Sequence, residues 1–238
     1  MGRKAAQTAE ALTDIYDRLF DCYGPQHWWP GETPFEVIIG AILTQSTAWT
    51  NVEKAIANLK SEGLLDAVSL DEIETEKLEM LIRPSGYYNA KAAKLKAFVE
   101  RLNREYDSDL NRLFALDTES LRIELLSIHG IGPETADSIL LYAAHRPVFV
   151  IDAYTKRIIG QLRLAPVSES YEAFQQLFMD RLPQDEAMFN EYHALLVRHG
   201  KDVCRKTPKC ESCCLANLPK KRCPSAEGPM RLGISHSL

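Results

Sequence analysis

Apolar residues recur at helical spacing along most of the chain, and most of these stripes begin near a residue that can cap a helix. One stripe follows Thr8 and consists of Leu12, Ile15 and Leu19. Pro34 can occupy the first turn of a helix over FEVIIGAILTQ, and Asp117 can cap the helix that contains ESLRIELLSI. The pattern predicts a nearly all-α fold of about ten helices with short connections.

The one β-like segment is PVFVI at 147–151. A single strand of this length cannot build a sheet, so we expect a buried connector between helices. No run of about 18 apolar residues is present that could span a bilayer, and the N-terminal residues become amphipathic too early for a signal peptide. We therefore expect a cytoplasmic protein with no membrane partner, associated with the nucleoid if it is bacterial.

The length of 238 residues and the hydrophobic content of 45% suit one large or two small globular domains. The net charge of −5 excludes a uniformly basic, nucleic-acid-coating protein. Residues 201–238 nevertheless carry eight basic and three acidic side chains, which gives them a net charge of +5 and leaves −10 for the rest. A basic tail of this kind can approach phosphate, although many ordinary tails are basic.

The sequence IHGIGPETA predicts two helices joined by a tight turn over 129–132. Gly130 and Gly132 allow the backbone to approach a ligand closely, and the unpaired amides at the start of the second helix favour a phosphate oxygen. The alternative is a purely structural turn between packed helices. Asp152 follows the apolar connector, 20 residues after Gly132. It is either a partly desolvated functional carboxylate, the N-cap of a helix over DAYTKRIIGQL, or both.

Four segments in order resemble the HhH-GPD family of DNA glycosylases, which is named for its helix-hairpin-helix and Gly/Pro-rich, Asp motif and includes endonuclease III. They are GAILTQST, GYYNAKAAKL, IHGIGPETA with Asp152 at the family's fixed distance, and HALLVRHGKDVC. The resemblance covers about residues 8–223. It implies a six-helix barrel domain over 24–146 that contains the hairpin, and a second helical domain formed by 1–23 with 147–238.

The resemblance also implies roles for individual residues. Double-stranded DNA with a damaged base would bind between the two domains of a monomer, and Asp152 would be the catalytic carboxylate. Gln45 would fill the space left by the extruded base. The residues expected to contact DNA are Gln45, Gly130, Gly132 and Thr135.

A cysteine-rich loop follows the last of these segments, and its predicted metal ligands are Cys204, Cys210, Cys213 and Cys223. Their intervals are five, two and nine residues, whereas the family's usual intervals are six, two and five, and Cys214 competes with Cys213 for the third position. Four thiolates suit a [4Fe–4S] cluster or tetrahedral zinc, and the resemblance favours the iron–sulfur cluster. We expect the basic loop over 204–223 to contact the DNA backbone, and Cys22, far upstream, to be buried and inert.

The residue before Thr135 is Glu134, at the position where bifunctional family members carry the lysine that forms a Schiff base with the sugar. A carboxylate cannot form that imine, and Lys156 is the one nearby substitute. The resemblance therefore implies a monofunctional glycosylase without strand-cleaving lyase activity, in which Asp152 stabilises the sugar cation and activates a water molecule.

All three tryptophans, Trp28, Trp29 and Trp49, lie within the first fifty residues. Core packing is the usual role of a tryptophan. The region WWPGETPFEVIIGAILTQSTAW, however, resembles that of endonuclease III-like 3-methyladenine DNA glycosylases, which implies a base pocket for a cationic alkylated purine. Two alternatives stay open: a glycosylase for oxidised pyrimidines or mismatched uracil or thymine, and a non-catalytic DNA-damage binding protein.

Overall fold

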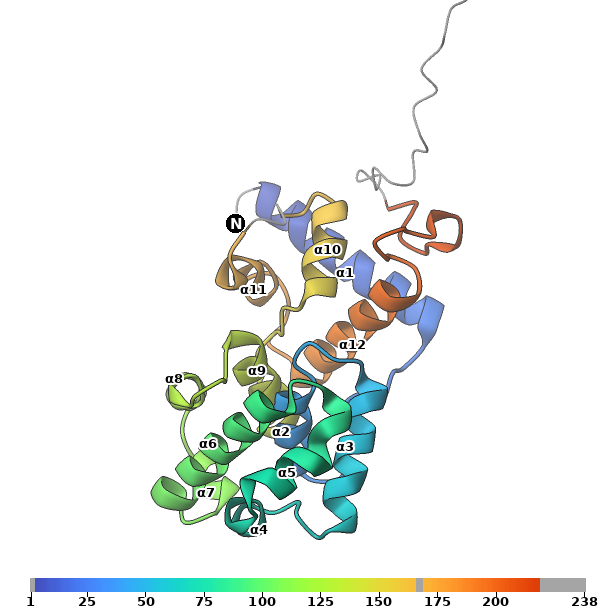
Figure 1. The fold of residues 1–238 in the computed structure, drawn as a ribbon. Helices are drawn as coiled ribbons and strands as arrows, with labels where there is room; N and C mark the ends of the chain where they lie inside the picture. The colour runs from blue at the N-terminus through green and yellow to red at the C-terminus, as the bar shows by residue number, and fades with distance from the viewer. Residues whose placement is uncertain (1–2, 166–168, 219–238) are drawn as a thin grey trace, which may run out of the picture. The chain divides into compact units, whose positions relative to one another are not determined.

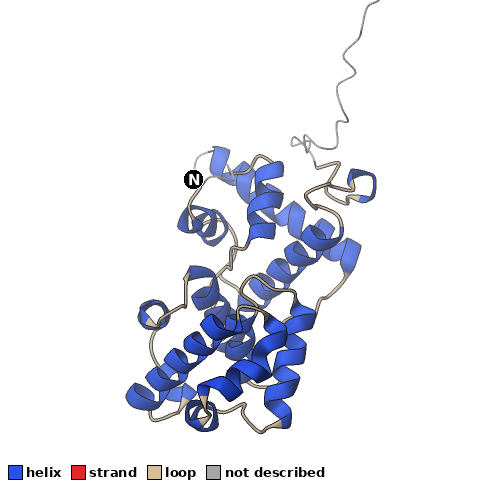
Figure 2. Cartoon of the chain, viewed as in Figure 1, coloured by secondary structure: helices blue, strands red, loops and turns tan. Residues whose placement is uncertain are grey.

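The computed structural model describes residues 3–165 and 169–218 (Figure 1). Its described residues form helices and connecting loops, without a strand (Figure 2), which confirms the all-α fold class. The chain divides into two compact units: His27–Val150, called here the hairpin unit, and Met1–Gln26 with Ile151–Leu238, called here the aspartate unit. The boundaries expected from the sequence, 24 and 146, lie close to these. No described helix is long and apolar enough to cross a membrane.

The hairpin unit is built around one helix that is buried along its length. Its elements are α2 (Pro34–Leu43), α3 (Trp49–Ser61), α4 (Ala67–Glu72), α5 (Thr75–Ile82), η1 (Arg83–Ser85), α6 (Tyr88–Tyr106), α7 (Leu110–Phe114), α8 (Thr118–Ser127), α9 (Pro133–Ser138) and η2 (Ile139–Ala143). All residues of α2 from Phe35 to Leu43 are buried, with Glu36 as its one charged residue, and α3, α6 and η2 pack against the helix. The Thr33 side chain caps α2 by accepting a hydrogen bond from the Glu36 amide (3.1 Å), and Pro34 fills the first turn as predicted.

The aspartate unit contains α1 (Arg3–Tyr23), α10 (Ala153–Gln161), α11 (Tyr171–Met179), α12 (Glu186–Asp202) and the short turn η3 (Cys210–Ser212). α12 packs against both α1 and α10 (Figure 1). The predicted stripe of α1 is fully buried, and the Tyr192 hydroxyl of α12 donates to the Leu12 carbonyl oxygen at 2.8 Å. α1 begins before Thr8, because the preceding residues RKAAQ are themselves good helix formers.

The segment 147–151 is a buried connector, as predicted. Four successive side chains in it, from Val148 to Ile151, are buried, and no strand pairs with them among the described residues. This connector leads directly into Asp152, which is the first polar residue after it. Within the aspartate unit, the Ile151 amide donates to the Tyr171 hydroxyl at 3.3 Å, which holds the residue before the aspartate.

Candidate functional site

The predicted hairpin lies between α8 and α9. A hydrogen bond from the Ile131 amide to the Ile128 carbonyl (3.1 Å) closes the turn. Gly130 has φ of +82°, a left-handed conformation that L side chains rarely adopt. Gly132 has φ of −94°, and a Cβ added to it would meet nothing within 4 Å. The turn therefore requires glycine at 130, whereas glycine at 132 keeps the space beside the backbone open.

The Gln45 side chain is bound to this hairpin. Its Nε2 donates to the Gly130 carbonyl oxygen at 3.1 Å and to Thr135 Oγ1 at 3.0 Å, and its Oε1 accepts a hydrogen bond from Lys94 Nζ of α6. The structure thus brings together three residues that the sequence predicts to contact DNA. Lys94 was missed, although it is the second lysine of the motif GYYNAKAAKL, and that motif is the signal that could have found it.

The first lysine of the same motif holds the end of α2. Lys91 is 2% exposed, and its ammonium donates to the carbonyl oxygens of Leu43 (2.9 Å) and Ser85 (2.6 Å). Burial, with a smaller contribution from the charge of Lys94, lowers the pKa of Lys91 to about 8. α6 therefore positions Gln45 twice: Lys91 binds the backbone two residues before it, and Lys94 binds its side chain.

The three tryptophans form one aromatic cluster in the hairpin unit. Their ring centroids are 5.2 Å (Trp28–Trp29), 5.3 Å (Trp28–Trp49) and 5.0 Å (Trp29–Trp49) apart, and Tyr142 of η2 lies 5.1 Å from Trp29. A Cβ on Gly40 of α2 would come within 3.2 Å of Trp29 Nε1 and 3.3 Å of Trp49 Cη2. Gly40 therefore makes room for the indoles. The sequence analysis missed both Gly40 and Tyr142.

The indole N–H groups of this cluster are buried without an acceptor. Trp28 Nε1, Trp29 Nε1 and Trp49 Nε1 have no hydrogen-bond partner within the described residues. Each buried donor left unpaired costs roughly 1–3 kcal/mol. Three such donors in one cluster are unusual for an ordinary core, which satisfies the polar end of a buried tryptophan. They are consistent with a ligand that supplies acceptors.

Asp152 caps α10 and is almost completely buried. Its Oδ1 accepts a hydrogen bond from the Thr155 amide at 2.7 Å, so the carboxylate is held in a fixed orientation. Its Oδ2 lies 3.8 Å from Nε2 of His193 on α12. Burial lowers the pKa of His193, partly offset by the charge of Asp152, so the imidazole is neutral at neutral pH. His193 was missed, although it begins the segment HALLVRHGKDVC.

Glu134, at the position of the lyase lysine of bifunctional family members, and Lys156, its possible substitute, have different surroundings. Glu134 is exposed in the first turn of α9, directly before the buried Thr135. Lys156 lies one turn into α10, where its ammonium is 5.4 Å from the centre of the Phe174 ring and donates to the Glu169 carbonyl oxygen at 3.3 Å. Lys156 is therefore engaged with residues near and within α11 in its own unit.

The first three predicted metal ligands line one cavity of about 100 Å³ in the aspartate unit: Cys204, Cys210 and Cys213. Arg157 of α10 anchors the start of this loop by donating to the carbonyl oxygen of Cys204 at 2.8 Å. Cys214 does not line the cavity. Its thiol is hydrogen-bonded to Cys22, and burial is the main cause that raises its pKa to about 12.

The prediction for Cys22 is wrong in one respect, because the residue is exposed. Cys22 lies in the last turn of α1, beyond the stripe ending at Leu19 that packs in the core. The thiolate donor set fits a metal cluster in part, since three predicted ligands share a cavity. Among the described residues, however, no three His, Cys, Asp or Glu side chains are grouped as a metal site. Cys223 lies outside the described residues.

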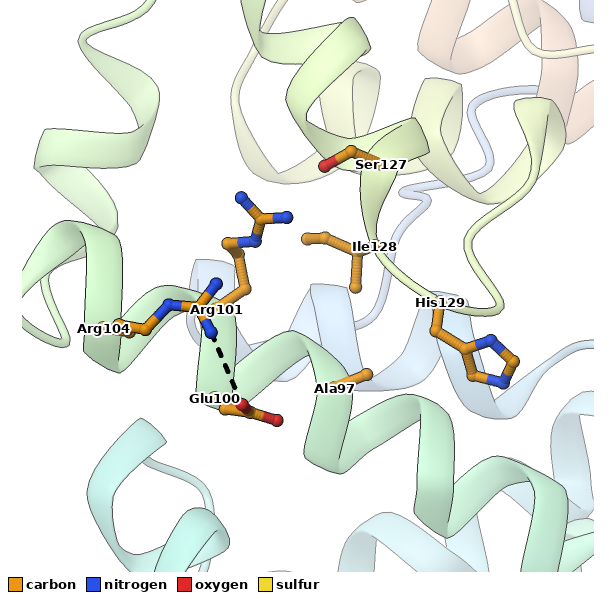
Figure 3. Close-up of a pocket in the computed structure, with 7 residues that line it drawn as sticks. All are labelled: Ala97, Glu100, Arg101, Arg104, Ser127, Ile128 and His129. Carbon is orange, nitrogen blue, oxygen red and sulfur yellow. Dashed lines mark ion pairs between the residues drawn. The ribbon is translucent and has the colours of Figure 1, made fainter.

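A second cavity, of about 170 Å³, lies beside the hairpin and is drawn in Figure 3. Arg101, Arg104 and His129 are among its lining residues. Carboxylates pair with both guanidinium groups: Glu124 lies 3.4 Å from Arg101, and Glu100 lies 3.6 Å from Arg104. Because these carboxylates offset the two positive charges, the cavity does not concentrate the potential that an anion site requires.

The chain is similar to known DNA repair proteins over most of its length. A protein of Methanocaldococcus jannaschii, named by inference as a DNA repair glycosylase, is 48% identical over 86% of this chain and 93% of its own. Endonuclease III of Sulfolobus acidocaldarius is 30% identical over 78% of this chain and 81% of its own.

Solved structures give the same result. The 3-methyladenine DNA glycosylase of Helicobacter pylori, bound to 1,N6-ethenoadenine, matches with a TM-score of 0.68 and 28% identity, over 83% of this chain and 97% of that one. An endonuclease III–DNA complex matches with a TM-score of 0.78 and 21% identity, over 95% and 98% of the two chains, which supports the fold. The family model of the HhH-GPD superfamily base excision DNA repair proteins matches residues 39–184. The chain therefore belongs to the HhH-GPD superfamily and is an endonuclease III-like DNA glycosylase.

Proposed function

We propose that this protein is a monofunctional DNA N-glycosylase that extrudes and removes alkylated purines such as 3-methyladenine. One observation carries the substrate assignment: the aromatic cluster of Trp28, Trp29, Trp49 and Tyr142, with three buried indole N–H groups that have no acceptor within the described residues. The similarity to a 3-methyladenine DNA glycosylase that binds a modified adenine supports the same assignment.

The cluster offers two kinds of interaction to such a base. A 3-methylated adenine is cationic, so the indole faces attract it through their quadrupoles, by about 0.5–2 kcal/mol for each contact. The purine ring retains nitrogen acceptors that can receive hydrogen bonds from indole N–H groups. A cationic base also leaves the sugar readily, so the site needs no strong general acid. A neutral pyrimidine would gain less from the same surroundings.

Asp152 would act on the sugar. A carboxylate held by the Thr155 amide can stabilise the positive charge that develops at the anomeric carbon and can deprotonate an attacking water molecule. The neighbouring His193 is neutral because burial lowers its pKa. A neutral imidazole does not compensate the carboxylate, so the full negative charge of Asp152 remains for the transition state.

The remaining predicted residues would bind double-stranded DNA. Gln45 would enter the duplex in place of the extruded base, and the hairpin backbone at Gly130 and Gly132, with Thr135, would bind the DNA backbone. The exposed basic residues Arg205, Lys206 and Lys209 of the cysteine loop would add charge next to phosphate. We expect the protein to act in the cytoplasm as a monomer.

Because the space beside Gly132 is open, a substitution there can weaken DNA binding without changing the stability of the fold. Gly132→Ala is expected to leave the melting temperature nearly unchanged, because φ of −94° suits alanine and its Cβ meets nothing within 4 Å. The same methyl group would obstruct a phosphate oxygen approaching the backbone, so affinity for undamaged duplex should fall several-fold in a fluorescence-anisotropy titration. Gly130→Ala should instead lower stability, by about 1 kcal/mol or more, because φ is +82°. Unchanged DNA affinity in Gly132→Ala would exclude the hairpin contact.

Glu134 predicts the absence of lyase chemistry. Borohydride should not trap the protein covalently on abasic DNA, because a carboxylate forms no imine that borohydride could reduce. Product strands should stay intact until alkali is added. Gel electrophoresis of both reactions, with an enzyme that has a lyase lysine as the positive control, measures this. Efficient trapping that disappears in Lys156→Ala would contradict the proposal by identifying another nucleophile.

We also propose that Cys204, Cys210, Cys213 and Cys223 hold a [4Fe–4S] cluster, with zinc as the alternative. The cavity shared by the first three supports this assignment, and the location of Cys214 beside Cys22 favours Cys213 as the third ligand. When bound, the group would cross-link the loop through its bonds to the four cysteine thiolates. Arg157 would hold the start of that loop against α10, the helix that Asp152 caps.

The neighbouring cysteines allow a matched test of the metal assignment. Cys213→Ser should lose the brown colour and most of about four irons per chain, whereas Cys214→Ser should keep both. Iron and zinc analysis of anaerobically purified protein measures the outcome. If the wild-type protein is colourless and contains one zinc per chain, the four cysteines hold zinc and not an iron–sulfur cluster. If Cys214→Ser loses the iron and Cys213→Ser keeps it, the third ligand is Cys214 and not Cys213.

A release assay on duplexes with single defined lesions tests the substrate assignment. We expect 3-methyladenine to be released much faster than uracil, mismatched thymine or an oxidised pyrimidine. An oxidised pyrimidine as the best substrate would contradict the assignment, although Asp152 would keep its role. Tight binding to damaged DNA without release of any base would make the protein a damage-binding protein instead.

A further inference from the structure

Lys94 differs from the two arginines that follow it on α6. It lies half-buried on α6, and it forms no ion pair with any described carboxylate. Its ammonium is bound to the neutral amide oxygen of Gln45. Arg101 and Arg104, further along the same helix, each have a carboxylate partner. Lys94 is therefore a positive charge beside the hairpin that no described carboxylate compensates.

The side chain of Lys94 runs across the first glycine of the hairpin. A Cβ added to Gly130 would lie 2.6 Å from Lys94 Cδ and 2.8 Å from Cε, so the methylene groups occupy the space that a side chain would need. Gly130 therefore serves the turn and also admits this lysine. The Gly130 carbonyl oxygen accepts a hydrogen bond from Gln45 Nε2, and Gln45 Oε1 accepts one from the Lys94 ammonium.

Both ends of the Gln45 amide are occupied as a result. The Nε2 atom donates to Gly130 and Thr135, and the Oε1 atom accepts from Lys94. A glutamine that enters a duplex must give up these hydrogen bonds. The arrangement thus holds Gln45 against the hairpin.

We propose that Lys94 binds a phosphate of the DNA backbone and that this contact releases Gln45 for insertion into the duplex. The inference rests on the proposed function, in which Gln45 replaces an extruded base. An ammonium binds an anionic phosphate more strongly than a neutral amide oxygen because both partners then carry charge, so an approaching phosphate attracts the ammonium away from Oε1. Gln45 then keeps only the two bonds of its Nε2. Engagement of the backbone would therefore precede insertion of Gln45.

The first test measures the phosphate contact without any need for base release. Affinity for undamaged duplex is titrated at several salt concentrations for wild type, Lys94→Met, Lys94→Arg and Lys77→Met. Lys94→Met should lower the slope of log K against log salt by about 0.9, the value for one phosphate contact. Lys94→Arg should keep the slope because it keeps the charge. Lys77 of α5, whose charge is already paired with Glu62 at 2.7 Å, is the matched control and should not change it.

The second test measures release of Gln45. 2-Aminopurine is placed opposite an abasic analogue, and the fluorescence change on binding reports insertion of a side chain at that position. Gln45→Ala should lose the change. Lys94→Met lacks the hydrogen bond to Oε1, so its fluorescence change should be several-fold faster than that of wild type when the duplex is saturated with protein. The double variant should lose the change as Gln45→Ala does, because Lys94 acts through Gln45. Lys94→Arg should restore the wild-type rate.

The outcomes distinguish the parts of the proposal. An unchanged salt slope in Lys94→Met would overturn the phosphate contact. A reduced slope with a wild-type fluorescence rate would overturn the release of Gln45 and leave only the contact. Neither measurement depends on the lesion that is removed, so failure to release any base would contradict the proposed function while leaving both results on Lys94 interpretable.

Discussion

Asp152→Asn is expected to lower base release by about a hundredfold to ten-thousandfold, the range that a positioned acid–base group contributes. Asparagine has nearly the shape of aspartate and is an equally good N-cap, so it can keep the hydrogen bond from the Thr155 amide at 2.7 Å. It cannot neutralise a developing sugar cation or accept a proton from water at neutral pH. Single-turnover release from a methylated duplex measures the loss, and anisotropy should give unchanged DNA affinity.

Asp185→Asn is the matched control. Asp185 caps α12 in the same unit by accepting a hydrogen bond from the Met188 amide at 2.8 Å, so the variant makes the same chemical change at another N-cap. It should retain the wild-type rate. Equal rates for Asp152→Asn and wild type would reduce Asp152 to a structural cap. Equal losses in both variants would attribute the effect to helix capping.

Local patterns were sufficient to predict the helices and the hairpin. The apolar stripe of α1, Pro34 at the start of α2 and Asp117 as the cap of α8 all depend on neighbouring residues alone, and each is found in the structure. The left-handed conformation of Gly130 follows from the same local chemistry, since glycine adopts it at little cost. Thr8 lies inside α1 and does not cap it, because the residues before it have high helix propensity and the helix begins at Arg3.

Contacts between distant segments could not be predicted in the same way. Tyr142 lies in an apolar run that reads as core, and only the packing of η2 against α2 brings it to Trp29. His193 reaches Asp152 because α12 packs against α10. Cys22 was expected to be buried from its helical stripe, but the fully buried stripe of α1 ends at Leu19 and Cys22 is exposed. These positions depend on tertiary packing, which the sequence pattern does not encode locally.

Lys94 belongs to a motif that the sequence analysis used, although the analysis did not predict what this lysine binds. The segment GYYNAKAAKL contributed to the family resemblance, yet the pattern did not indicate that both of its lysines bind the segment around Gln45. Their spacing of three residues places Lys91 and Lys94 on one face of α6. That face meets the end of α2 and the hairpin, so one helix positions two parts of the candidate site.

Trp49→Ala is expected to lower specific release of 3-methyladenine roughly tenfold to a hundredfold, because one base–aromatic stack contributes about 1–3 kcal/mol. The loss should be confined to the damaged base. Affinity for undamaged duplex should barely change, because we propose that the hairpin and the basic residues carry it. Release rates and anisotropy titrations are measured at a temperature where circular dichroism shows the variant to be folded, since removing a packed indole also destabilises the hairpin unit.

Trp49→Phe separates the two interactions proposed for the indole. Phenylalanine keeps an aromatic face but removes the Nε1–H donor, which is buried and has no acceptor within the described residues. If the base accepts this hydrogen bond, Trp49→Phe should lose several-fold in release relative to wild type while remaining faster than Trp49→Ala. Wild-type release by Trp49→Phe would limit the indole to stacking. Wild-type release by Trp49→Ala would make it a core residue, and the base pocket would then have to be sought elsewhere.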